Sequence, residues 1–401
     1  MEINWSLAST SWDSEEYSAM QDVIDSGFFS MGSKTSEFEE IFAKWAGRKF
    51  AVMVNSGSSA NLVAASALRY VRDFDALPDK KGLLGEVIVP AVSWSTTFFP
   101  FFQNRYKLVF VDVDRETFNI DSKSIEAAIT PQTVGICGVN LLGLSANWSE
   151  INKIADDHGL WTLEDNCESM GSFSSDGNSG TFGDVSTFSF FYSHHICTME
   201  GGMIVCDDED LYTAMRSLRA HGWAREVPVE NKFLGVDRAS KWNENFRFYL
   251  PGYNVRPLEL SAAIGIKQLE KFDKILDIRR NNAKKLSESL DKLETHWKLQ
   301  SSNEGSSWFT FGLVNTHPEF GPIFRDNLVK IFNESGVQSR PIVAGDFTKN
   351  PVVKWLDVEI STNLPGAQLI NDCGLMIGNH HFDLSQQIQM LPELILRSER
   401  T

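Results

Sequence analysis

Short apolar runs alternate with amphipathic segments through the first half of the chain. The runs KFAVMV, EVIVP, KLVFVDVD, TVGICGVN and LWTLED have the length and composition of buried strands. Apolar residues recur every three or four positions in residues 14–27, 35–46 and 147–158 and from about Ser59 onward, which predicts helices. This alternation predicts an α/β fold with a doubly wound, mostly parallel sheet.

A long helical pattern over residues 256–293 divides the chain into two parts. Strand-like and helix-like runs follow it, among them SSWFTFGLVN and FRDNLVKIFNES. A length of 401 residues also fits about two domains. We therefore expect a large domain over residues 1–265, with a helical arm at its N-terminus, and a smaller α+β domain over residues 266–401.

Charge and composition exclude several classes of protein. The net charge of −16, without any long Lys/Arg block, argues against a nucleic-acid partner. We find no apolar run long enough to span a membrane, and the first residues do not resemble a secretory signal. The five cysteines are scattered without CxxC spacing, which is typical of a reducing compartment and argues against a zinc site. We therefore expect a cytoplasmic protein that binds no metal.

Polar motifs fall where the predicted strands end, which is where ligands bind in open parallel sheets. The segment NSGSSAN, Asn55–Asn61, joins a strand to a helix and has the geometry of a phosphate site, although an ordinary turn has the same pattern. Asp165 is either a solvated loop residue or a buried carboxylate that needs a cation such as a protonated pyridine nitrogen. Trp94 is either a core residue or an exposed ring that stacks on a flat ligand.

Two adjacent histidines, His194 and His195, stand in the segment TFSFFYSHHICTMEGG. Neighbouring residues point in different directions on a strand or a helix, so the two rarely bind one metal ion together. A structural histidine and a general base with a pKa near neutrality remain as interpretations.

Taken in order, the Gly-Ser turn, the loop tryptophan, the acid pair ED and the SF…EGG segment resemble a known family. It is the sugar-nucleotide aminotransferase (DegT/DnrJ/EryC/StrS) family, which has the aspartate-aminotransferase fold, PLP fold type I. The resemblance runs from SMGSKTSEFEEIFA to MIGNHH. In that family a lysine in the SF…EGG segment binds pyridoxal phosphate covalently; here the matching residue is His194, and no lysine occurs between Lys153 and Lys232.

The SHHI-T-EGG pattern resembles the 3-dehydratase branch of the family. That branch implies pyridoxal 5'-phosphate and pyridoxamine 5'-phosphate held without a covalent bond, and L-glutamate as amino donor. It further implies loss of the C3 hydroxyl from a nucleotide-linked 4-keto-6-deoxyhexose, specifically GDP-4-keto-6-deoxy-D-mannose, with release of ammonia. The implied setting is 3,6-dideoxysugar biosynthesis for lipopolysaccharide O-antigen, and the implied assembly is a homodimer.

The resemblance also assigns individual residues. His194 is the catalytic base. Three residues are expected at the substrate: His221, Phe246 and Arg340. The residues expected to bind the cofactor are Gly57, Ser58, Ser59 and Ser189 around the phosphate, Trp94 on the ring, Asp165 at the ring nitrogen, Glu168 near the ring hydroxyl, and Asn254 reaching the phosphate from a neighbouring subunit.

Three alternatives remain from the sequence. A CDP-sugar 3-dehydrase also has the histidine but carries an iron–sulfur cluster; Cys167 matches its first ligand, and the other ligands are missing. An ordinary sugar-nucleotide aminotransferase would need a distant lysine. A non-catalytic protein that only binds a nucleotide sugar is the third possibility, although such a relative should also have lost Asp165 or the Gly/Ser loop.

Overall fold

The computed structural model describes residues 4–73, 82–227, 230–231, 236–237, 246–361 and 363–400. Its helices are α1 (Ser14–Ser26), α2 (Ser33–Ala46), α3 (Gly57–Val71), α4 (Ser95–Gln103), α5 (Ser122–Ala128), α6 (Trp148–His158), α7 (Glu209–Arg219), α8 (Glu259–Glu270), α9 (Phe272–Leu290), α10 (Gly321–Ser335), α11 (Pro365–Cys373) and α12 (Ser385–Ser398). Its strands are β1 (Phe50–Val54), β2 (Gly85–Pro90), β3 (Tyr106–Val111), β4 (Thr133–Val139), β5 (Trp161–Asp165), β6 (Phe173–Ser174), β7 (Gly177–Asn178), β8 (Val185–Ser189), β9 (Gly202–Cys206), β10 (Glu230–Asn231), β11 (Val236–Asp237), β12 (Trp297–Leu299), β13 (Thr310–Asn315), β14 (Ser339–Arg340), β15 (Val358–Ile360) and β16 (Gly374–Gly378). None of these helices combines the length and the hydropathy that crossing a bilayer requires.

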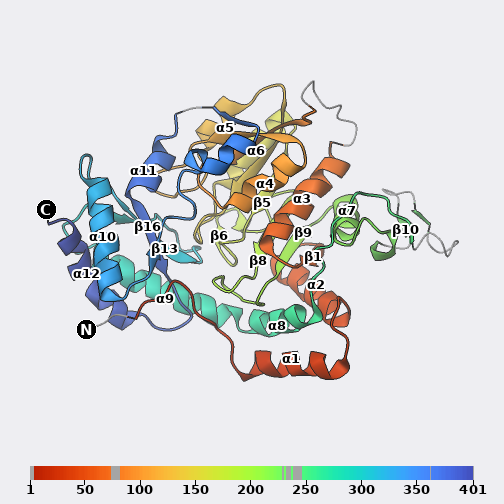
Figure 1. The fold of residues 1–401 in the computed structure, drawn as a ribbon, viewed down its shortest axis with the longest axis horizontal. Coiled ribbons are helices and arrows are strands. Elements are labelled where there is room, and N and C mark those ends of the chain that lie inside the picture. The colour runs from red at the N-terminus through yellow and green to blue at the C-terminus, as the bar shows by residue number, and fades with distance from the viewer. Residues whose placement is uncertain are drawn as a thin grey trace.

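An eight-stranded sheet forms the centre of the molecule, with the strand order β1-β9-β8-β5-β4-β2-β3-β15 (Figure 1). The neighbours from β8 to β15 pair in parallel, and β9 runs antiparallel to both β1 and β8. The predicted α/β fold with a mostly parallel sheet is therefore confirmed.

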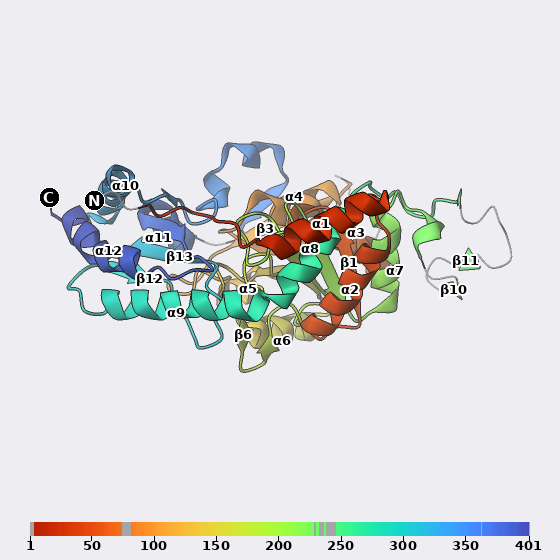
Figure 2. The same cartoon turned by 90° about the horizontal axis from the view of Figure 1, so that it is seen from below.

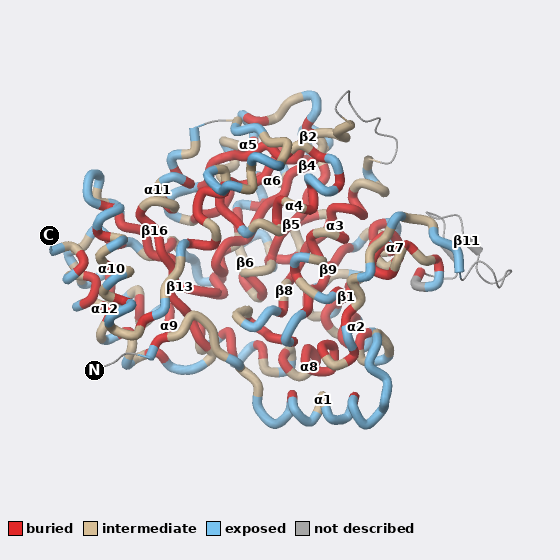
Figure 3. The backbone as a smooth tube through the Cα atoms, in the orientation of Figure 1, coloured by how far each residue is buried: buried red, intermediate tan, exposed pale blue. Residues whose placement is uncertain are grey.

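Helices cover both faces of the large sheet. In β2, Val87 and Val89 join the core formed with α3 and α4, whereas Ile88 packs with Trp148 and Ile151 of α6. This alternation follows from the two-residue repeat of a strand, and it explains why the strand sequences are almost wholly apolar. The burial colours of Figure 3 show the strands as the most protected part of the molecule.

A second sheet, β12-β13-β16-β14, packs with α9, α10 and α12 at one end of the molecule, where both chain termini lie (Figures 1 and 2). The predicted boundary after residue 265 falls inside α8. In addition, β15 belongs to the C-terminal part of the chain but pairs with β3 of the large sheet. The division into two domains stays a prediction.

The helical pattern over residues 256–293 forms two helices rather than the single one expected. α8 ends at Glu270 and α9 begins at Phe272. Between them, the N–H of Lys271 donates to the carbonyl of Gln268, three residues back, which tightens the turn and ends the regular helix. Hydrophobic periodicity continues across this break, so the sequence pattern does not reveal it.

One buried side chain ties α8 to the N-terminus of α2. Glu259 is 3% exposed and accepts hydrogen bonds from the N–H groups of Gly32, Lys34 and Thr35 at 2.6, 2.8 and 2.9 Å, and from the Thr35 hydroxyl at 2.7 Å. The cap residue of α2, Gly32, has no side chain that could serve these donors. A carboxylate from a neighbouring helix therefore caps α2.

We expect Glu259→Ala to lower the free energy of unfolding by about 3 kcal/mol, because it leaves buried donors of α2 without an acceptor. Urea denaturation followed by circular dichroism measures this loss. The matched control is Glu270→Ala on the same helix, which removes an exposed ion pair with Lys267 and should cost no more than about 0.5 kcal/mol. Equal losses in the two variants would contradict the capping role.

Candidate active site

A cavity of about 480 Å³ lies at the carboxyl ends of β1, β5 and β8 and beside the loop that follows β2. This is the edge where ligands bind in open parallel sheets. Phe309 and Arg340, from the C-terminal part of the chain, complete its wall. The predicted site residues that line this cavity are Gly57, Ser58, Trp94, Asp165, Glu168, Ser189, His194 and Arg340.

The N-terminus of α3 forms one end of the cavity. The cap residue Ser56 accepts a hydrogen bond from the Ser59 N–H at 3.0 Å, which leaves the N–H groups of Gly57 and Ser58 at the cavity wall for an anion. A Cβ atom on Gly57 would lie 2.5 Å from Cβ of Ser189, so only glycine allows these two segments to approach so closely. Ser59 contributes to the cap and not to the cavity wall, and its cofactor contact stays a prediction.

Asp165 is a buried carboxylate at the end of β5 and not a solvated loop residue; it is 4% exposed. Its Oδ2 accepts hydrogen bonds from Asn61 Nδ2 at 2.9 Å and Thr97 Oγ1 at 2.8 Å. The Thr187 hydroxyl donates to Asn61 Oδ1 at 2.6 Å and so fixes the orientation of the amide. Within the described part of the chain, the hydrogen-bond donors to Asp165 are neutral groups. A cationic ligand atom would therefore complete the site.

Trp94 lies at the rim of the cavity. It is 51% exposed and directly precedes α4. The structure thus excludes the core position and leaves the ring free to stack on a flat ligand.

His194 projects from the loop between β8 and β9 into the cavity wall. Its ring centroid lies 5.0 Å from that of Phe309, and its Nδ1 lies 3.5 Å from the Ser193 hydroxyl. Burial, followed by the positive charges of Arg340 and Arg279, lowers the pKa of His194 to about 3. The imidazole is therefore neutral at neutral pH, and its lone pair can accept a proton.

His195 points away from this chemistry. It is 2% exposed, is not part of the cavity wall, and its Nε2 lies 3.0 Å from the carbonyl oxygen of Ser307. Its ring packs edge-on against Phe272, with 6.3 Å between the ring centroids. A structural role accounts for these contacts.

Glu168 and Arg340 are the other charged candidates in the cavity wall. Burial raises the pKa of Glu168 to about 7, against the opposing effects of the hydrogen bond from the Leu142 N–H and of the charge on Arg340. Within the part of the chain that the structure describes, the Nε of Arg340 is buried without a hydrogen-bond partner. A buried guanidinium N–H without an acceptor is costly, which favours a ligand oxygen beside Arg340.

The structure does not bring His221, Phe246 or Asn254 to the wall of this cavity. His221 packs against Trp223, with 5.1 Å between the ring centroids, and Phe246 is 54% exposed. Asn254 accepts a hydrogen bond from Arg256 at 3.0 Å. Asn254 is predicted to act in a neighbouring subunit, which a single chain does not show. The roles of His221, Phe246 and Asn254 therefore stay predictions.

Sequence reasoning missed Asn61, Thr97 and Phe309. Asn61 lies one helical turn after Gly57, so the helical period could have placed it at the cavity. Thr97 is likewise in the first turn of α4. Phe309 is more than 100 residues away from His194 in the chain, and no local sequence pattern marks it as a site residue.

Comparison with protein families agrees with this fold. Residues 10–388 match the DegT/DnrJ/EryC1/StrS aminotransferase family, and the chain belongs to it.

Two relatives within the family share nearly the whole chain. GDP-4-keto-6-deoxy-D-mannose 3-dehydratase of Escherichia coli O55:H7 is 46% identical over 396 residues, which cover 98% of this chain and 100% of that protein. The enzyme of the same name from Yersinia pseudotuberculosis is 45% identical over 390 residues and covers 97% of each chain. A solved structure of the E. coli enzyme with bound hydrated pyridoxal phosphate superimposes with a TM-score of 0.91 at 44% identity, over 98% of this chain and 100% of that one.

We expect the His194 ring to remain neutral from about pH 8 to about pH 5, because burial and two guanidinium groups disfavour the imidazolium ion. In the unfolded chain His194 regains its ordinary pKa of about 6.5, so it binds a proton more readily there than in the folded protein. Protonation of His194 therefore favours unfolding increasingly as the pH falls below about 6.5. NMR titration of the imidazole resonances, assigned by their loss in His194→Asn, measures the midpoint. Arg340→Met should move it upward, and a wild-type midpoint near 6.5 would contradict the prediction.

Proposed function

We propose that the chain is a pyridoxal-phosphate-dependent 3-dehydratase that acts on GDP-4-keto-6-deoxy-D-mannose in the cytoplasm. The observation that carries the proposal is the neutral imidazole of His194 in the cavity wall, where aminotransferases of the family carry a lysine. Among the described residues around the cavity, none is a lysine. The overall likeness to two 3-dehydratases supports the same chemistry.

The residues fit pyridoxal phosphate without a covalent bond. The N-terminus of α3, with Gly57 and Ser58, suits the phosphate together with the Ser189 hydroxyl. Asp165 offers the anionic partner that a protonated pyridine nitrogen needs. Trp94 offers a ring face, and Glu168 lies where a ring hydroxyl would find a hydrogen-bond partner.

When bound in its amine form, the cofactor supplies an amino group for the sugar ketone and a ring that accepts an electron pair. With the cofactor bound, Asp165 would keep the ring nitrogen protonated, which would increase that electron demand. His194 would take the proton from the carbon next to the amine, and it would then be placed to give this proton to the C3 hydroxyl that leaves as water. Arg340 binds an oxygen of the sugar or the carboxylate of glutamate.

The overall reaction replaces the C3 hydroxyl by hydrogen and oxidises glutamate. The sugar loses one oxygen atom, and each turnover forms one 2-oxoglutarate and one ammonia. Mass analysis of the products from a panel of GDP-, CDP- and dTDP-linked 4-keto-6-deoxy sugars, with glutamate and pyridoxal phosphate present, tests both the reaction and the nucleotide. An amino sugar as product would instead identify an aminotransferase, and no product from any sugar would favour a binding protein.

We expect His194→Asn to retain pyridoxal phosphate within about threefold of the wild-type Kd, because the phosphate and ring contacts come from other residues. Its turnover should fall by at least about 100-fold, since the base is lost. His194→Lys should form a covalent bond with the cofactor that borohydride makes permanent, whereas wild-type protein should take no such label. Undiminished turnover in His194→Asn would remove His194 from the mechanism.

The proposed active form is a homodimer. Large apolar side chains, among them Phe28, Phe29, Phe191 and Leu258, are each between 45% and 54% exposed, which is typical of a surface that a second chain covers. Phe191 itself lines the cavity, so the proposed contact would adjoin the site. In this assembly Asn254 of each subunit reaches the cofactor phosphate in the site of the other subunit.

Mixed dimers test this arrangement. His194→Asn and Asn254→Ala should each be weakly active as homodimers. Unfolding and refolding them together should restore part of the activity, because one of the two sites in a mixed dimer then has both residues intact. Sedimentation gives the oligomeric state, and activity no higher than the average of the two variants would contradict a site shared between subunits.

A further inference from the structure

The position of the His194 ring depends on the loop that carries it. In lysine-bearing relatives a covalent bond to the cofactor fixes the corresponding side chain, whereas here no such bond is available. Backbone hydrogen bonds join Phe190 to Gly201 and Thr198 to Phe190, each at 2.9 Å, and so close the base of the loop. Additional contacts must hold its far side.

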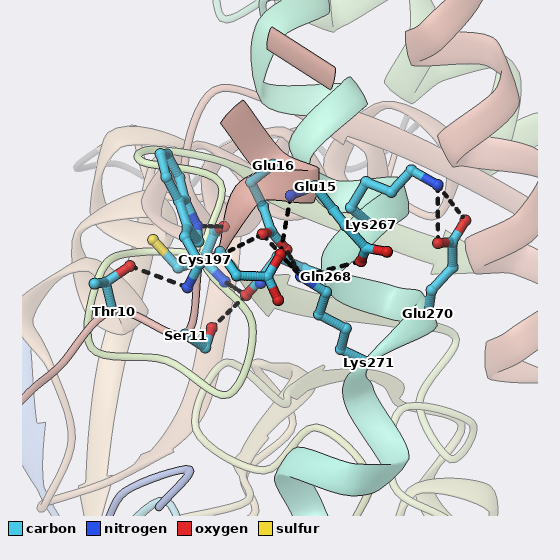
Figure 4. Close-up of polar contacts among 11 residues, drawn as sticks. Thr10, Ser11, Glu15, Glu16, Cys197, Lys267, Gln268, Glu270 and Lys271 are labelled. Atoms are coloured by element: carbon cyan, nitrogen blue, oxygen red, sulfur yellow. Dashed lines mark hydrogen bonds and ion pairs between the residues drawn. The ribbon is translucent and has the colours of Figure 1, made fainter. Parts of the chain in front are cut away.

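Both polar groups of the Cys197 backbone are held by side chains from outside the loop (Figure 4). Its N–H donates to Gln268 Oε1 of α8 at 3.1 Å, and its carbonyl accepts from Trp12 Nε1 at 2.9 Å. Cys197 follows His194 by three residues. Two segments that are distant in sequence thus clamp the loop close to the base.

The Gln268 amide has one orientation that satisfies all its partners. The side chain is fully buried; its Oε1 also accepts from the Ser11 hydroxyl at 2.6 Å, and its Nε2 donates to Glu16 Oε1 at 2.7 Å. A reversed amide would place its oxygen against the Glu16 carboxylate and its NH₂ group against the Cys197 N–H. The Glu16 contact therefore keeps the acceptor of Gln268 directed at the loop.

Glu16 in turn depends on α1 and Lys271. Burial alone would raise the pKa of Glu16, but hydrogen bonds from the Asp13 N–H, Gln268 and Lys271 outweigh it and lower the pKa. The Lys271 ammonium lies 2.9 Å from both carboxylate oxygens. Besides Glu16, α1 buries Val23, and Lys271 also pairs with Asp13 and Glu15, so these ion pairs contribute to the attachment of α1 to α8. Figure 1 shows α1 along the outer side of α8.

We propose that Gln268 and Trp12 are positioning residues for His194: by holding the Cys197 backbone from α8 and from the N-terminal segment, they fix the loop that presents the base. The assignment of a chemical step to His194 rests on the proposed function. The anchoring of the loop rests on the hydrogen bonds alone.

Two nearly isosteric substitutions each remove one side of the clamp. Gln268→Met removes the acceptor for the Cys197 N–H, and Trp12→Phe removes the donor to its carbonyl. We expect kcat to fall roughly tenfold in each, because small displacements of a base are costly. KM and the Kd for pyridoxal phosphate should stay within about twofold of wild type, since the proposed phosphate and ring-nitrogen contacts lie on α3, β5 and β8 and the proposed substrate residue Arg340 lies on β14, outside the loop. The double variant should lose less than the product of the two effects, because both act on the backbone of the same residue, Cys197.

Hydrogen–deuterium exchange of residues 190–200 supplies a readout that needs no turnover. Exchange there should become faster in both variants. The matched control is Val23→Ala, which weakens the packing of α1 without touching the clamp. It should lower Tm yet keep kcat and loop exchange near wild type.

Unchanged kcat and loop exchange in Gln268→Met and Trp12→Phe, with Tm lowered as in Val23→Ala, would overturn the proposal and leave the network a purely structural role. Faster exchange with kcat unchanged would also overturn it, because the loop would then move without consequence for the base. A wild-type protein that deoxygenates no sugar would defeat the proposed function, while the exchange data would still test the anchoring.

Discussion

The buried carboxylate of Asp165, whose hydrogen-bond donors among the described residues are all neutral, determines which ligand the whole site can accept. Asp165 lies at the end of a central strand, where Asn61 and Thr97 solvate it with neutral dipoles. Such dipoles offset only part of the cost of removing a charge from water. The cavity is therefore electrostatically incomplete by itself, and it favours a flat ligand that brings a positive nitrogen to this point and a phosphate to the N-terminus of α3.

The cavity shifts the pKa values of two titratable groups, His194 and Glu168, in opposite directions. Burial lowers the pKa of His194 to about 3, with help from Arg340 and Arg279, and raises the pKa of Glu168 to about 7. The first group is a neutral base over the whole physiological range, and the second can hold or give a proton near neutrality. Sites that work by proton transfer are typically built on such a separation of pKa values. Because the proposed base is a histidine rather than a lysine, it would form no covalent bond with the cofactor, and the proposed function would make the geometry of its loop more important than in relatives that carry the lysine.

The sequence predicted the parts of this structure that local pattern controls. The strands β1 to β5 and the turn before α3 follow from hydrophobic periodicity and from the rule that ligands bind at strand ends. For Asp165 and Trp94 the sequence left a site position and an ordinary one both open, and only the structure decides between them. Local sequence patterns could not predict contacts between residues far apart in the chain, such as the contact between Phe309 and His194. The break at Lys271 was missed for a related reason, since it lies in an uninterrupted apolar repeat. His221 lies outside the cavity wall of its own chain, and a single chain does not test its role.

The strand β15 has a consequence for how the protein is made. It pairs in parallel with β3, although about 250 residues separate them. During synthesis the outer edge of β3 therefore stays exposed until residues 358–360 have left the ribosome. Once paired, β15 fastens the C-terminal part of the chain to the large sheet. Any movement that carried β15 away from the large sheet would have to break this pairing.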